Sequence, residues 1–123
     1  DIGIIQLGIV DCAPRLINEK SFVWKIVRRL PSFFIEMYIA YLKNNTERDP
    51  KNVLVSENEF RMNMKNYLDR CAKINLKKLI FIAIPYPGIE MVKKNPHIIG
   101  NSIRYNYIIQ QETLNYPFVQ ILN

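Results

Sequence analysis

The sequence is poor in the residues from which several common kinds of functional site are built. It has two cysteines, Cys12 and Cys71, which are far apart and form no C-x-x-C pair, and one histidine, His97. This composition excludes a disulfide framework and a zinc site of the cysteine–histidine type. The four glycines are too scattered for a phosphate-binding loop. We therefore expect two buried free thiols, no bound metal and no cofactor.

Long apolar runs are also missing. The longest nearly uncharged stretch, Ser32–Leu42, is interrupted by Glu36 and is shorter than the ~20 residues that a membrane-spanning helix needs. The first apolar run follows Asp1 directly, without the basic leader of a signal peptide. Since there is no disulfide framework either, the cytoplasm is the favoured compartment. The start at Asp1, without an initiator methionine, leads us to expect a fragment or a processed chain.

The overall composition is typical of a soluble globular domain, with 49% apolar and 23% charged residues. The 123 residues correspond to about one domain. Lysine and arginine number 17 against 11 acidic residues, a net charge of +6 that permits an anionic partner without requiring one. The basic residues follow no known nucleic-acid-binding pattern, so we expect no nucleic-acid partner.

Three almost wholly apolar segments, Ile2–Val10, Leu79–Ile84 and Phe118–Leu122, predict strands buried on both faces. In the segments between these strands apolar residues recur at helical spacing, so helices are predicted there. Each of these connections is long enough to cross over the sheet. The sequence therefore predicts a single α/β domain over residues 1–123. Its three parallel strands should follow chain order, with right-handed crossovers and with helices on both faces of the sheet.

The first connection opens with a long helical region, residues 19–43, which Pro31 breaks or kinks. Basic and then aromatic residues form a cluster along it: Lys25, Arg28, Arg29, Phe33, Phe34, Tyr38 and Tyr41. The second half is apolar nearly all round, which predicts that it is buried or bound to something. Three interpretations are open: a helix on a membrane surface, a lid over an acyl or sugar pocket, and a solvated basic face followed by a core helix, which we favour.

Two further helices are expected. Ser56 and Glu59 form the S-x-x-E pattern of a capping box, in which each side chain bonds the other residue's free backbone N–H, so a helix begins there. Another should run over Asn101–Leu114. No serine of the chain lies in the strand–turn–helix motif of a nucleophile elbow.

Functional residues of parallel sheets gather beyond the carboxyl ends of the strands. At the first of these ends the segment IIQLGIVDCAPR resembles the third conserved block, G-x-N-D, of the SGNH (GDSL-type) hydrolase superfamily, with Gly8 and Asp11 in the Gly and Asp positions. The later layout is similar too: a helix near Ser56, a buried strand ending in a Pro-rich turn, then NSIRYN and a last strand. The resemblance spans essentially the whole chain and implies a three-layer, flavodoxin-like α/β fold.

The chain departs from the family pattern at three places. It has no G-D-S block with a nucleophilic serine and no D-x-x-H block, and Val10 stands where the family has an oxyanion-donating Asn. An aliphatic side chain cannot donate that hydrogen bond. The resemblance therefore implies the C-terminal part of an ester hydrolase or acyl transferase acting on a carbohydrate or lipid acyl ester. This chain would carry three strands of an incomplete sheet and no catalytic residue, and it would be inactive alone.

One wall of the site is expected within the chain, formed by Gly8, Val10, Asp11, Arg15, Pro85 and Tyr86. For Asp11 we favour a structural role, its carboxylate accepting backbone N–H bonds in the turn, over acid–base catalysis. Arg15 either holds an anionic substrate group or pairs with Asp11. His97 lies in an irregular polar segment and is expected to be a surface residue.

Two statements about partners complete the expectations. The alternative to a hydrolase fragment is a non-catalytic α/β module that binds a protein or membrane partner through its aromatic helix. The strand Ile2–Val10 has no lysine, proline or bulge to protect it if it lies at the sheet edge, so we expect a homo-oligomer.

Overall fold

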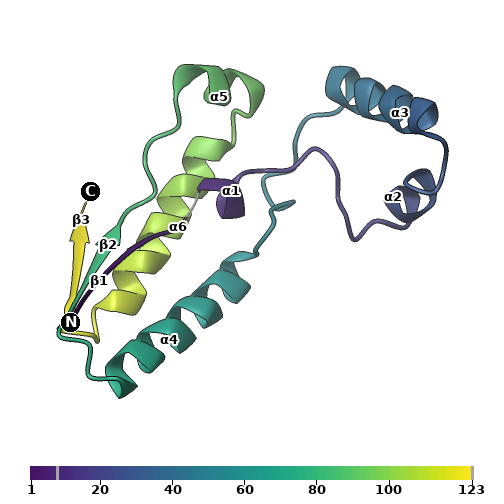
Figure 1. Cartoon of the computed structure of the whole chain (residues 1–123). Helices are drawn as coiled ribbons and strands as arrows, with labels where there is room; N and C mark the ends of the chain where they lie inside the picture. Colours follow the sequence, from purple (N-terminus) through teal and green to yellow (C-terminus); the bar gives the residue numbers. More distant parts are fainter. Residues whose placement is uncertain (8, 123) are drawn as a thin grey trace.

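The computed structural model describes residues 1–7 and 9–122 of the chain (Figure 1). Its elements, in chain order, are β1 (Ile2–Gln6), α1 (Ile9–Cys12), α2 (Phe22–Val27), α3 (Ser32–Asn45), α4 (Glu57–Lys73), β2 (Lys78–Ile82), α5 (Ile89–Lys94), α6 (Ile98–Thr113) and β3 (Val119–Leu122). The predicted first strand is shorter than expected, because β1 ends at Gln6 and Ile9 already begins α1.

The three strands form one parallel sheet in the order β1-β2-β3. Ile4 lies opposite Ile80, and Ile80 lies opposite Gln120. The predicted α/β class, parallel pairing and strand order are confirmed. The predicted start of α4 is also confirmed, since Ser56 and Glu59 form a complete capping box.

Both long helices, α4 and α6, cover the same face of the sheet (Figure 1). Helix α4 lies in the connection from β1 to β2, and α6 lies in the connection from β2 to β3. When strands are added in chain order in one direction, right-handed crossovers put every connecting helix on one side. The described residues therefore form two layers, and the expectation of helices on both faces was wrong.

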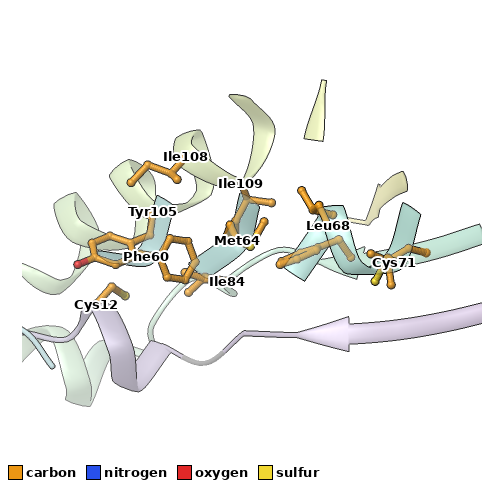
Figure 2. Close-up of a cluster of buried hydrophobic side chains, with 11 residues drawn as sticks. Cys12, Phe60, Met64, Leu68, Cys71, Ile84, Tyr105, Ile108 and Ile109 are labelled. Carbon is orange, nitrogen blue, oxygen red and sulfur yellow. The ribbon is translucent and has the colours of Figure 1, made fainter. Parts of the chain in front are cut away.

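The core lies between these two helices and the covered face of the sheet. Helix α4 contributes Phe60, Met64, Leu68 and Cys71, α6 contributes Tyr105, Ile108 and Ile109, and Cys12, Leu79, Phe81 and Ile84 complete the cluster. Figure 2 shows a continuous row of these side chains from Cys12 to Cys71. The rings of Phe60 and Tyr105 lie 4.9 Å apart, centroid to centroid. Both cysteines are buried thiols, as predicted.

The opposite face of the sheet is open, and apolar residues alternate there with exposed Gln6, Lys78 and Gln120. Ile2 and Ile4 expose 68% and 70% of their surface, and Leu122 exposes 46%. Ile80 and Ile82 of the central strand are only half-buried. In addition β1 is an edge strand, so its outer N–H and C=O groups have no partner strand among the described residues.

The helices α2 and α3 are the second departure from expectation. They contact each other and project from the rest of the chain (Figure 1). No residue of either helix is buried. The favoured interpretation of the aromatic segment as a core helix is therefore wrong. We call Ser21–Asn45 the α2–α3 hairpin.

The open sheet face and the β1 edge lead us to predict that the chain self-associates at micromolar concentration. Ile4→Lys should shift the population toward monomer, because a lysine at a sheet edge opposes pairing and apolar contact. Met62→Lys, at an exposed position of α4, is the matched control and should leave association unchanged. Sedimentation velocity measures both. A wild-type chain that stays monomeric throughout would contradict the prediction.

Candidate functional site

The segment after β1, residues 11–15, is held through its backbone by side chains from distant parts of the chain. Asn95 Nδ2 donates to the carbonyl of Pro14 at 2.9 Å, and Arg48 Nη1 donates to the same carbonyl at 3.0 Å. Asn101 Nδ2 donates to the carbonyl of Cys12 at 2.7 Å. Residues 11–15, for which the sequence predicts no helix or strand, are therefore held in place at the carboxyl end of the sheet by these hydrogen bonds.

Asn101 is the centre of this arrangement. Its side chain is 1% exposed, and its Nδ2 also donates to the carbonyl of Pro50 at 2.9 Å. Its Oδ1 accepts a hydrogen bond from Arg104 one turn later in α6. One amide thus joins the turn after β1, the start of α6 and the return loop, residues 46–56, which leads from α3 to α4.

The return loop runs beside the turn after β1. Arg15 N donates to the carbonyl of Asn52 at 2.6 Å, and Asn52 Nδ2 donates back to the carbonyl of Arg15 at 2.8 Å. The carbonyl of Asp11 accepts from Val55 N at 3.4 Å. We call this paired region, residues 11–15 with the return loop, the neck, because the α2–α3 hairpin is connected through it.

Asp11 and Arg15 have other partners than those expected. Within the described residues, the Asp11 carboxylate accepts no backbone N–H, so the structural role expected for it is not observed. Arg15 Nη1 lies 2.7 Å from Glu19 Oε1, so Arg15 pairs with Glu19 rather than with Asp11, which was one of the two alternatives left open for it. Arg15 also lines a cavity of about 610 Å³ together with the return loop.

The other expected wall residues divide into two groups. Pro85 and Tyr86 line a separate cavity of about 670 Å³ at the carboxyl end of β2, whereas Val10 is an exposed residue of α1. Gly8 lies outside the described residues. Of the six residues expected to form one wall, the structure places Pro85 and Tyr86 in a common cavity.

The remaining lining of the Tyr86 cavity comes mainly from α6, which sequence reasoning did not identify. Asn106 Oδ1 accepts from Ile84 N at 2.8 Å, and its Nδ2 donates to the carbonyl of the same residue at 2.9 Å. This amide continues the hydrogen bonding of β2 beyond its last residue. Exposed Tyr107 and Tyr86 and the amide of Gln6 give the cavity aromatic and hydrogen-bonding surface.

Ser102 connects this cavity with the turn after β1. Its hydroxyl donates to the carbonyl of Ile98 at 2.9 Å and lies 3.9 Å from the sulfur of Cys12. Burial raises the pKa of the Cys12 thiol, against a smaller opposite effect of the Ser102 hydroxyl. A buried, protonated thiol is a poor nucleophile, and Ser102 has a carbonyl rather than a base as its partner.

The described residues hold no acid–base pair suited to activating a nucleophile at the Tyr86 cavity. His97 Nε2 lies 3.2 Å from Glu47 Oε1 at the partly exposed start of α6, and neither residue lines the cavity. Among residues 1–7 and 9–122, no group of histidine, cysteine and acidic side chains could hold a metal ion. None of the helices in this part of the chain has the length and apolarity to cross a bilayer.

Comparison of the chain with protein-family models, curated proteins and solved structures finds no match. The arguments for function therefore rest on the residues and geometry described above.

Asn101→Ala is expected to destabilise the chain by about 2–3 kcal/mol, because it leaves the buried Cys12 carbonyl and the half-buried Pro50 carbonyl without this donor. The free energy of unfolding in urea measures this. The exposed Asn63→Ala on α4 is the control and should change stability by less than about 0.5 kcal/mol. Equal effects of the two substitutions would show that the Asn101 amide does not organise the neck.

The raised pKa of Tyr105 leads us to predict that the folded state loses stability at alkaline pH. Its hydroxyl donates to the carbonyl of Val55, and burial is the main cause that raises its pKa from 10.0 to about 12. Below pH 10 the tyrosine is protonated in both states, whereas between pH 10 and 12 only the unfolded state ionises, so stability falls as pH rises through this window. Tyr105→Phe should reduce this fall in denaturant titrations. An unchanged slope would contradict the assignment.

Proposed function

We propose that the chain is the C-terminal part of an SGNH-like ester hydrolase or acyl transferase, acting on a carbohydrate or lipid acyl ester. The observation that carries the proposal is the arrangement of β1, β2 and β3, in chain order, with both crossover helices on one face. In a flavodoxin-like sheet of order 2-1-3-4-5, the last three strands have this arrangement.

The open surfaces agree with this proposal. In the complete three-layer fold, the nucleophile strand would pair with the β1 edge. The helix after that strand would lie on the open face, because its connection to the second strand runs in the opposite direction to the connections seen here. These are the surfaces on which Ile2 and Ile4 are exposed. The short helix α1, with Asp11, follows β1 at the carboxyl end of the sheet, where the family has its third block.

The chain's own contribution to catalysis would be binding and positioning. Tyr86, Tyr107 and the amide of Gln6 give the cavity the aromatic and hydrogen-bonding groups that suit a sugar or acyl group. Serine, histidine and aspartate of the triad would come from outside residues 1–123. Because Val10 cannot donate to an oxyanion, another donor must supply the ~2.7–4 kcal/mol that such a hydrogen bond contributes.

A second candidate function has an observation in its favour. The exposure of Phe33, Phe34 and Tyr41 on α3 supports a non-catalytic α/β module that binds a partner through its aromatic helix. The two candidates differ in whether a nucleophilic serine is present in the complete reading frame.

The catalytic proposal predicts that this chain alone releases no p-nitrophenol from acetyl or butyryl esters above the buffer rate, because it lacks the triad. The protein translated from the complete reading frame should hydrolyse the esters and react covalently with a fluorophosphonate probe. Replacing the labelled serine by alanine should abolish both signals. Failure of the complete protein to react with the probe, or turnover by this chain that maps to one of its residues, would contradict the proposal.

A further inference from the structure

The α2–α3 hairpin presents apolar side chains to solvent on both of its helices. Phe22 and Phe33 expose 75% and 64% of their surface. The other exposed large apolar residues of the hairpin are Val23, Ile26, Leu30, Phe34, Met37 and Tyr41. On α3 the spacing of Phe33, Met37 and Tyr41 places them on one side of the helix. Large exposed apolar side chains gathered on two helices that contact each other mark a surface that binds something.

The charged residues of the hairpin are mainly cationic. Between residues 21 and 45 there are four cationic residues, Lys25, Arg28, Arg29 and Lys43, and one carboxylate, Glu36, all of them exposed. The net charge of +3 in this segment is half of the +6 of the whole chain. Exposed apolar and aromatic groups beside cations are the combination with which peripheral helices bind anionic lipid surfaces.

Other occupants fit the hairpin less well. A second copy would bring two segments of charge +3 together, which repel each other at close range. A folded protein partner would need a groove that fits exposed apolar side chains of both helices at once. A fluid bilayer surface adapts to side chains that project in several directions.

We propose that the α2–α3 hairpin binds the surface of an anionic lipid bilayer, with its aromatic side chains in the headgroup region and its cations at the lipid phosphates. This proposal rests on the second candidate function, the non-catalytic binding module, and gives its partner as a lipid surface. It does not depend on the catalytic proposal. The hairpin lies on the surface and does not span the bilayer.

The only tryptophan of the sequence, Trp24, lies in α2 and reports directly on the hairpin. The experiment titrates the chain with vesicles of phosphatidylcholine alone and of equal parts phosphatidylcholine and phosphatidylglycerol. We expect a blue shift of Trp24 emission and co-sedimentation with the anionic vesicles only. Added salt should weaken the binding, because it screens the attraction between the exposed charges.

Two variants and their matched controls test the role of the hairpin. Arg28→Gln/Arg29→Gln should weaken partitioning about 30-fold, since each cation near an anionic surface contributes about a fivefold factor. Lys77→Gln/Lys78→Gln removes the same charge at exposed positions outside the hairpin and should have little effect. Phe33→Ser/Phe34→Ser should weaken binding by at least about tenfold, whereas the exposed Met62→Ser should not. Circular dichroism checks that each variant folds.

Several results would overturn the proposal: no binding to anionic vesicles, equal binding to neutral ones, or an equal loss in the two double-charge variants. An equal Trp24 shift with soluble polyglutamate would instead indicate an acidic protein partner. A Trp24 shift that depends on protein concentration without lipid would indicate a second copy. Because none of these readouts involves ester hydrolysis, they are independent of the result for the catalytic proposal.

Discussion

The buried amide of Asn101 is the interaction on which the arrangement of the site end depends. The side chain joins the carbonyls of Cys12 and Pro50, which are far apart in the sequence, to the first turn of α6. Carbonyls removed from water need donors, and an asparagine can supply two from one nitrogen. The turn after β1, the return loop and α6 are thus placed relative to one another by polar contacts at the edge of the apolar core.

The sheet carries its two covering helices on one face, and this asymmetry explains why Ile2, Ile4 and Leu122 are exposed on the other. Leu79 and Phe81 point toward α4 and α6 and are completely buried, whereas Ile80 between them is only half-buried. Such alternation along a strand is typical of a sheet with one covered face. The residues of β2 are nonetheless almost all apolar, as in strands that are covered on both faces.

The apolar segments were sufficient to predict the three strands and their order. The S-x-x-E pattern was sufficient to predict the capped start of α4, because capping depends on local chemistry. The apolar pattern could not place α3, since an apolar helix has the same composition whether its partner is its own core or another surface. The two-layer arrangement follows from strand order and crossover handedness together.

At the site, Pro85 and Tyr86 were predicted, whereas Asn101, Ser102 and Asn106 were not. Their signal was the row of polar residues in an otherwise apolar helix. The pairing of Arg15 with Glu19 arises in an irregular segment, where spacing alone does not determine contacts.

The neck brings the two ends of the hairpin region together, with Arg15 N and the Asn52 carbonyl 2.6 Å apart. The entropy cost of closing a loop grows only slowly with its length, by about 0.6 kcal/mol for each doubling. The 25 residues of the α2–α3 hairpin, which lie between these contacts, can therefore vary in length and sequence, or be exchanged as a unit, without disturbing the sheet. The architecture thus separates an exposed, exchangeable module from a framework that holds the cavity.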